Sequence, residues 1–384
     1  MLRIAVIGVG NRAGKYMSCL APEAGVAFLV EPNPVRLAQA AQEYGVPQEA
    51  CFPDAESFFA RHRAVDGVII TTPDRLHYAQ ALAAIQAGYP VLLEKPATTS
   101  LEEFDSLLEA SERTGVPVSV CLVMRYHPYF RRIKEIVDDG EIGRILSIDH
   151  TESIGPDRMG HTFVRGLWSR KDISSPIFLS KCSHDADFLL WLAGGKVLDV
   201  SSEGGVTKFR PDRAPERTAA LRCVDCPLNC PYSAVSLYRD RRAWIAGFDI
   251  PEGKTIGEVI EHELAAGRYG RCVYHCDNDV NDWQEVRFRL DNGIQMRMFL
   301  DGVSLAEGRR TVIQGTEGTL RAYGSQLEVN GRVEVFSSLV DVPLHAGADR
   351  LLVQDFIDSL LTGQQTTGGL STTREAHRLC FLAG

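Results

Sequence analysis

The first third of the chain alternates short apolar strands with helices, and this pattern restricts its fold more than any other feature. Five apolar runs are separated by helical segments: Leu2–Ile7, Val26–Val30, Val68–Ile70, Val91–Leu93 and Val118–Leu122. Strands that are apolar on both faces, joined by helices of about 12 residues, are typical of a parallel sheet covered on both sides. The sequence therefore predicts an α/β fold, with a doubly wound parallel sheet over residues 1–122.

Beyond about residue 123 the pattern changes to strands that meet in hairpins. One hairpin is predicted around the turn Asp291-Asn292-Gly293, and another joins Gln326–Val329 to Arg332–Val335. Helices are predicted over Pro128–Asp138, His184–Leu192 and Asp349–Leu361. We therefore expect residues 123–384 to form a second α/β domain with a largely antiparallel open sheet.

The first strand ends in a glycine turn that is typical of a dinucleotide site. Gly8 and Gly10 follow the strand directly and precede a helix, so that backbone N–H groups can surround a pyrophosphate. Gly8 permits the tight turn, and Gly10 lets the phosphates approach the backbone. The cofactor contacts expected beyond the glycines are Asn11, Arg12 and Ala13. The arrangement predicts a Rossmann-type domain, although a βαβ unit whose glycines serve only the turn is the alternative.

An acidic residue closes the second strand. Glu31 lies about 20 residues past Gly10, where a carboxylate would hold the two ribose hydroxyls of NAD. The same carboxylate would repel the 2′-phosphate of NADP. Arg36 lies nearby and weakens this preference. NAD is therefore expected over NADP.

Polar residues also follow the third and fourth strands. The third strand ends in Thr71-Thr72-Pro73 with His77 just beyond, and the fourth ends in Glu94-Lys95-Pro96. Ligands of open α/β sheets bind beyond the carboxyl ends of the strands. We therefore expect all these residues except Pro96 to line the cofactor crevice, although His77 could instead only begin a helix.

Charge and hydropathy exclude several classes of protein. The 41 Lys and Arg against 50 Asp and Glu give a net charge of −9, which argues against a nucleic-acid-binding surface. No run approaches the roughly 18 apolar residues of a membrane span. The N-terminus runs straight into a strand without the layout of a signal peptide. A cytoplasmic protein without a nucleic-acid or membrane partner is expected.

Together these motifs resemble the glucose–fructose oxidoreductase/inositol dehydrogenase (Gfo/Idh/MocA) family. The matching segments are Gly8–Ala13, Thr72–His77, Glu94–Pro96, Arg125–Pro128, His184–Asp187 and Trp191–Gly194. The resemblance implies a Rossmann domain, a second domain with an open sheet, and dimers or tetramers built on that sheet. It also implies hydride exchange between NAD(P) and a sugar, a sugar derivative or a cyclitol.

In the family a Lys and a His flank the substrate, and the matching positions are Lys95 and His184. An imidazole suits the removal of a hydroxyl proton, and an ammonium stabilises charge on the same oxygen. Many members carry an Asp four residues before this His, where the present chain has Ser180. Lys181, three residues before His184, could replace it in binding substrate or in tuning the His; alternatively, His184 only caps a helix.

Three further residues are candidate sugar contacts: Arg125, Tyr126 and Trp168. Each could instead belong to the core.

Two other functions of the protein also stay open. NAD could be recycled in a redox-neutral elimination or glycoside hydrolysis, or the protein could bind NAD without catalysis.

Five of the ten cysteines fall in a loop at about 223–276. They are Cys223, Cys226, Cys230, Cys272 and Cys276. Thiols two to four residues apart, matched by a second pair, have the spacing of a structural zinc site. Unligated thiols and a disulfide or redox role are the alternatives, and five thiols are one more than tetrahedral zinc needs.

Overall fold

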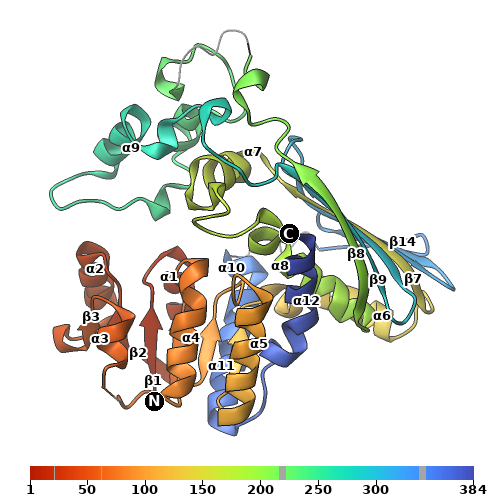
Figure 1. Cartoon of the computed structure of the whole chain (residues 1–384), viewed down its shortest axis with the longest axis horizontal. Coiled ribbons are helices and arrows are strands. Elements are labelled where there is room, and N and C mark those ends of the chain that lie inside the picture. The colour runs from red at the N-terminus through yellow and green to blue at the C-terminus, as the bar shows by residue number, and fades with distance from the viewer. Residues whose placement is uncertain (21, 62, 216–221, 337–342) are drawn as a thin grey trace. The chain divides into compact units, whose positions relative to one another are not determined.

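A computed structural model of the chain describes residues 1–20, 22–61, 63–215, 222–336 and 343–384 (Figure 1). It divides into two compact units, each built from separate stretches of the chain. The first contains residues 1–138, 183–192 and 336–381, and the second contains residues 139–182, 193–335 and 382–384. A domain boundary near residue 123 stays a prediction.

The first unit is built on a parallel sheet of six strands. These are β1 (Leu2–Ile7), β2 (Ala24–Val30), β3 (Cys51–Phe52), β4 (Gly67–Ile70), β5 (Val91–Leu93) and β6 (Val118–Val120). Their order is β3-β2-β1-β4-β5-β6, and the pairings are parallel. The order reverses between β1 and β4, which is where such sheets bind ligands. The predicted doubly wound sheet is confirmed; β3 was missed because two residues leave no pattern to recognise.

Helices cover both faces of this sheet. The helices of this unit are α1 (Asn11–Met17), α2 (Pro34–Tyr44), α3 (Ala55–Phe59), α4 (His77–Gln86), α5 (Leu101–Thr114), α6 (Pro128–Asp138), α10 (Pro343–Ala346), α11 (Ala348–Thr362) and α12 (Leu370–Ala383). Ile4 and Val6 of β1 share a core with Phe356 of α11, whereas Ala5 and Ile7 share the opposite core with α4 and α5. A helix near the end of the chain therefore completes the first unit, and Figure 1 draws it in blue beside the N-terminal strands.

Local sequence signals explain where several helices begin. Asn33 caps α2 by accepting hydrogen bonds from the N–H groups of Val35 and Arg36. Ser100 caps α5 through the N–H of Glu103, but the Glu103 carboxylate bonds Thr99 instead of returning to Ser100. Of the two hydrogen bonds of a capping box, only the one to the Ser100 side chain is formed at this helix start. Helix α8 (Ile177–Ala193) begins seven residues earlier than predicted and includes residues of both units.

The second unit is built on a sheet of eight strands. These are β7 (Ile145–Ile154), β8 (Val197–Gly205), β9 (Trp283–Leu290), β10 (Gln295–Asp301), β11 (Glu307–Gly315), β12 (Thr319–Tyr323), β13 (Gln326–Val329) and β14 (Arg332–Val335). Both predicted hairpins are confirmed, as β9–β10 and β13–β14. The interior pair β7–β10 is parallel and the other pairs are antiparallel, so the sheet is largely antiparallel as predicted. Two short helices, α7 (Pro156–Arg158) and α9 (Ile256–Ala265), belong to this unit.

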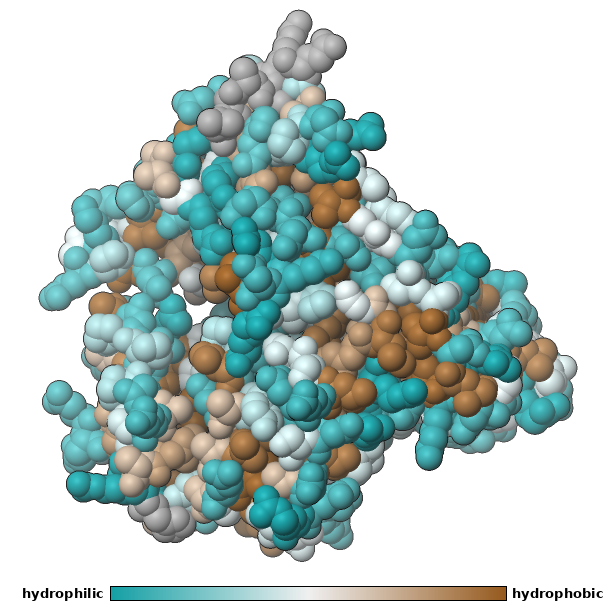
Figure 2. Space-filling model, in the orientation of Figure 1, coloured by the Kyte–Doolittle hydropathy of each residue, from teal (hydrophilic) through white to brown (hydrophobic). Residues whose placement is uncertain are grey.

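One face of the second sheet is apolar and the other carries charge. Met296, Met298 and Leu300 of β10 are buried, while Arg297 between them pairs with Glu285 at 2.6 Å and with Asp149 at 3.0 Å. Figure 2 shows hydrophilic residues over much of the visible surface and a patch of hydrophobic residues, in brown, at the right of the view. None of the described helices is long and apolar enough to cross a membrane.

Candidate active site

The strand register brings the predicted polar segments together at one edge of the first sheet. Ile7 of β1 pairs with Ile70 of β4, which pairs with Leu93 of β5. The next residue along each strand continues the pattern, because Thr71 N–H donates to Ile7 O and Glu94 N–H to Ile70 O, both at 2.9 Å. The glycine turn, the Thr-Thr-Pro segment and the Glu-Lys-Pro segment therefore leave the sheet side by side.

The glycine turn has the geometry expected of a phosphate-binding loop. Gly8 has a φ of +84°, and a Cβ there would meet Thr72 Cγ2 at 2.7 Å, so no other residue fits without a shift. Gly10 begins α1 in extended conformation, and a Cβ on it would meet nothing within 4 Å. Ala13 is fully buried against the sheet. The loop thus leaves open space at Gly10, beside the start of α1 at Asn11, which suits a dinucleotide.

The carboxylate of Glu31 lies at the glycine turn. It is 5% exposed and accepts hydrogen bonds from Val9 N–H at 2.8 Å and Asn33 N–H at 3.1 Å. Arg36 lies 3.5 Å from the same carboxylate. Carboxylate oxygens can accept several hydrogen bonds, so ribose hydroxyls can still be accommodated. Because Arg36 forms an ion pair with Glu31, its guanidinium is less available to bind a 2′-phosphate.

The His77 ring connects the Thr-Thr-Pro and Glu-Lys-Pro segments at this edge of the sheet. One ring nitrogen lies 2.7 Å from Pro96 O and the other 2.7 Å from Thr72 O. Thr71 Oγ1 donates to Gly8 O at 2.6 Å, which ties the third strand's end to the glycine turn. Both ring nitrogens of buried His77 contact the chain, so the ring positions the segment around Pro73. A cofactor contact of His77 stays a prediction.

A buried ionic network lies beneath Lys95. Arg12 pairs with Glu94 at 2.7 Å and with Asp349 of α11 at 2.9 Å, and Tyr16 donates to Glu94 at 3.0 Å. The second oxygen of Glu94 accepts from the N–H of Lys95. Arg12 and Glu94, predicted as cofactor contacts, are therefore engaged within the protein, where they fix the backbone at Lys95. Asp349 and Tyr16 were not predicted, since no motif in the sequence around them marks them.

The network keeps its carboxylates ionised. Burial alone would raise the pKa of Glu94, but the charges of Arg12 and Lys95 hold it below its usual value. Burial would also raise the pKa of Asp349, yet the hydrogen bond from His345 and the charge of Arg12 lower it to about 2. A carboxyl group whose pKa is lower in the folded state stabilises the fold at pH values above its unfolded-state pKa. This contribution is lost as the pH falls through the folded-state pKa.

We expect Asp349→Asn to lower the free energy of unfolding by about 2 kcal/mol near neutral pH, from the shift of 3.8 to about 2. The difference from wild type should shrink as the pH falls from about 4 to about 2. Urea unfolding across this range measures it. Asp358→Asn, which changes an exposed carboxylate of the same helix, is the control. A difference that does not change with pH would contradict the assigned ion pairs.

Lys95 and His184 belong to the same compact unit. Lys95 lies two residues past the end of β5. His184 lies in the middle of α8 rather than at its start, so the alternative of a helix-capping histidine is wrong. Burial raises the pKa of the Cys380 thiol, the charge of Asp185 raises it further, and Lys95 opposes this shift. The charges of Lys95 and of Asp185, the residue after His184, thus both act on the thiol of Cys380.

Lys181 is held by a carboxylate that sequence analysis did not select. Its ammonium bonds Glu152 of β7, and the other oxygen of Glu152 lies 3.1 Å from Arg309. Glu152 and Lys181 are 4% and 8% exposed, so the pair is buried. Because α8 begins early, Lys181 and His184 stand at i,i+3 spacing, as the sequence allowed. An acidic group therefore accompanies Lys181 even though the position of the family Asp is Ser180.

The predicted sugar contacts Arg125 and Tyr126 have partners inside the first unit. Arg125 makes two hydrogen bonds to Asp187 of α8, at 2.6 and 2.7 Å, and is 7% exposed. Tyr126 donates to Asp355 of α11 at 2.6 Å. Both side chains thus tie the helices of this unit together, and this arrangement does not support a substrate contact for Arg125.

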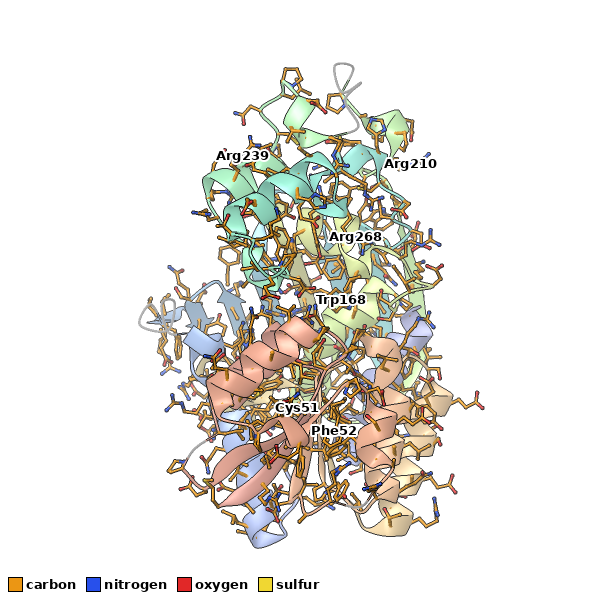
Figure 3. The ribbon with its side chains drawn as sticks, turned by 90° about the vertical axis from the view of Figure 1, so that its left-hand side faces the viewer. Cys51, Phe52, Trp168, Arg210, Arg239 and Arg268 are labelled. Carbon is orange, nitrogen blue, oxygen red and sulfur yellow. The ribbon has the colours of Figure 1, made fainter. Side chains whose placement is uncertain are left out.

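Trp168 and the clustered cysteines belong to the second unit. Trp168, marked in Figure 3, is half-buried in the 3-10 turn Leu167–Ser169. All ten cysteines are free thiols. Cys223, Cys226, Cys230 and Cys272 line one pocket, whereas Cys276 is not among its lining residues.

Two family models match this chain. One, described as an oxidoreductase family with an NAD-binding Rossmann fold, matches residues 2–122. The other, the C-terminal domain of the same family, matches residues 130–247. The chain belongs to the Gfo/Idh/MocA family. Its N-terminal sheet is the NAD-binding Rossmann fold of these oxidoreductases.

Several relatives in this family are inositol dehydrogenases. The scyllo-inositol 2-dehydrogenase (NAD(+)) of Bacillus subtilis is 29% identical over 211 residues, which cover 53% of this chain and 58% of that enzyme. The inositol 2-dehydrogenase of Corynebacterium glutamicum is 26% identical over 208 residues, 52% of this chain and 56% of that enzyme. The chain thus spans little more than half the length of these dehydrogenases. A longer match, 26% over 308 residues, covers 77% of this chain and 70% of the Bacillus subtilis protein named as oxidoreductase YteT.

Solved structures share the fold over the whole chain. An oxidoreductase from Agrobacterium radiobacter in complex with NAD+, L-tartaric acid and magnesium has a TM-score of 0.70 at 18% identity, covering 100% of this chain and 96% of that one. The scyllo-inositol dehydrogenase of Lactobacillus casei with bound NAD(H) and scyllo-inositol has a TM-score of 0.67 at 19% identity, covering 100% and 95%.

Proposed function

We propose that this protein is an NAD-dependent oxidoreductase that moves a hydride between nicotinamide and a secondary alcohol or ketone of a sugar, a sugar derivative or a cyclitol. The observation that carries the proposal is the edge of the first sheet. There the open turn at Gly10, the carboxylate of Glu31 and Lys95, whose backbone N–H is held by Glu94, lie beyond the ends of β1, β2 and β5. The inositol dehydrogenases among the relatives support a polyol substrate.

The nicotinamide, when bound, accepts or returns the hydride. The residues of the chain handle the proton and the charge. His184 takes the proton of the reacting hydroxyl, for which an imidazole titrating near neutral pH is suited. The Lys95 ammonium donates a hydrogen bond to the same oxygen and stabilises the negative charge that develops on it. In this proposal Lys181, fixed by Glu152, binds a substrate hydroxyl rather than carrying protons, and Trp168 offers an apolar face to the ring.

The proposal is tested by incubating the protein with NAD and a panel of cyclitols, aldoses, polyols and glycosides. NADH absorbance that rises in proportion to substrate consumed supports it. Product release from a glycoside without net NADH would replace it by redox-neutral chemistry. Tight NAD binding with no turnover on any compound would replace it by an NAD-binding role without catalysis.

We expect Glu31→Gln to weaken NAD binding by about 10-fold or more, because hydrogen bonds to a charged group contribute ~1.5–3 kcal/mol. Binding of NADP should stay level or improve, since the charge that repels a 2′-phosphate is removed. Titration with both cofactors measures the ratio, and Glu43→Gln on the exposed side of α2 is the control. An unchanged preference would contradict the role of Glu31.

We also propose that two copies meet through the charged face of the second sheet. That face carries a hollow of about 620 Å³ lined by residues of β7, β8, β9 and β10. Light scattering should give the mass of a dimer or tetramer, and the mass of one chain would contradict this.

A cytoplasmic location is proposed because the ten cysteines are free thiols, which a reducing compartment maintains.

A further inference from the structure

The second unit contains a pocket whose walls carry four thiols. It has a volume of about 200 Å³ and is lined by Cys223, Cys226, Cys230 and Cys272, among other residues. The thiol of Cys276 donates to Cys272 O at 3.3 Å and does not line the pocket. Of the five clustered cysteines, four therefore share one space.

Two of these cysteines flank one short β-bridge. Arg222 and Arg271 form an antiparallel β-bridge, and the next residue on each side is a cysteine. Cys223 begins a 3-10 turn closed by a bond from Cys226 N–H to Cys223 O at 3.3 Å. Cys272 caps a second turn, in which His275 N–H donates to Cys272 O at 3.0 Å. The two cysteine-led turns thus leave one bridge in opposite directions, and the thiol of Cys223 donates to Arg271 O, next to Cys272, at 3.8 Å.

A buried cation adjoins the thiols. Arg165 lines the same pocket, is 1% exposed and donates to two carbonyl oxygens, those of Arg271 at 2.6 Å and Tyr232 at 2.7 Å. It also donates to Cys223 Sγ at 3.4 Å, while its Nη1 has no hydrogen-bond partner. No carboxylate of the described chain pairs with it. A buried guanidinium without a counter-charge is costly, so negative charge is expected in this pocket.

We propose that these four cysteines bind a structural Zn²⁺ ion, with Arg165 donating hydrogen bonds to the thiolate sulfurs. Binding releases the four thiol protons to solvent, and four thiolates around Zn²⁺ leave the excess negative charge that the guanidinium lacks. No three His, Cys, Asp or Glu side chains of the described residues are arranged to hold a metal as they stand. The ligand set therefore assembles by rotation of the cysteine side chains within the pocket.

The surrounding fold explains what the ion would do. The segment from Arg222 to Cys276 has a small core of five buried residues, Ala234, Leu237, Tyr238, Ile260 and Leu264. So few apolar residues stabilise a segment weakly, and such segments use metals or disulfides as cross-links. The ion joins the two ends of this segment.

The experiment measures the metal content of the full chain, purified without a metal-affinity step from cells supplied with zinc. We expect about one zinc per chain, and less than ~0.2 in Cys226→Ser. Cys276→Ser is the matched control and should keep its zinc. Co²⁺ exchanged into the protein should show thiolate-to-cobalt charge-transfer absorption and tetrahedral d–d bands.

Arg165→Met should lose zinc to a competing chelator about 10–100 times more readily, the usual effect of removing a partner of a metal ligand. Three results would overturn the proposal: wild-type zinc below ~0.2 per chain, equal zinc loss in Cys276→Ser and Cys226→Ser, or a disulfide among the four cysteines in protein denatured without reductant. None of these bears on the dehydrogenase assay, so the two proposals fail separately.

Discussion

Lys95→Ala is expected to lose turnover by about 100-fold or more while NAD binding is retained, because positioned proton-transfer and charge-stabilising groups contribute on the order of 10²–10⁴ in rate. The side chain leaves β5 at the sheet edge, and its backbone N–H is fixed by Glu94. The loss should fall mainly on kcat, since the developing charge on the substrate oxygen exists only in the transition state. Steady-state rates with the best substrate of the panel, and titration with NAD alone, measure the two effects.

Two variants separate this role from a general effect of charge or folding. Lys196→Ala removes an exposed ammonium in the turn before β8 and should leave turnover unchanged. His184→Ala should lower turnover on a similar scale and flatten the dependence of kcat on pH, because the base is lost. Near-normal turnover in Lys95→Ala would refute the assignment. A parallel loss of NAD binding would show that Lys95 holds the cofactor instead.

The parts of the site that follow local rules were predictable from the sequence. Gly8 and Glu31 serve turns at the ends of neighbouring strands, and the register of parallel strands brings such ends together whatever surrounds them. The edge position of Lys95 follows from the same rule. For these residues a short segment and the sheet order contain the necessary information.

Contacts between distant segments were not predictable in this way. Arg12 pairs with Asp349, and Lys181 with Glu152, through helices and strands far apart in the chain. Sequence analysis assigned Arg12 to the cofactor because its nearest motif is the glycine turn. The start of α8 at Ile177 was not predicted either. The apolar residues of this helix are buried on all sides, so the sequence shows no amphipathic pattern there.

Arg125 is the residue at which the predicted role, a sugar contact, and the observed role, an ion pair with Asp187, can best be told apart by experiment. Replacing it by methionine is expected to lower the free energy of unfolding by about 3–5 kcal/mol, because the carboxylate of Asp187 is left buried without its partner. Burial already raises the pKa of Asp187, and the charge of Arg125 opposes this. The variant also loses the bonds to Thr367 O and Thr372 O. Chemical unfolding, compared with wild type and with the exposed-site control Arg113→Met, measures the loss.

The double variant Arg125→Met with Asp187→Leu distinguishes a structural pair from a substrate contact. If the pair is structural, removing both charges should restore most of the stability lost in the single variant, since replacing a buried ion pair by apolar residues is often close to neutral. Catalysis should then recover with the fold. If Arg125 instead binds the sugar, Arg125→Met would unfold like wild type and raise KM, and the second substitution would restore nothing. That result would assign Arg125 to substrate binding, and not to the structural contact between η3 (Val123–Tyr126) and α8.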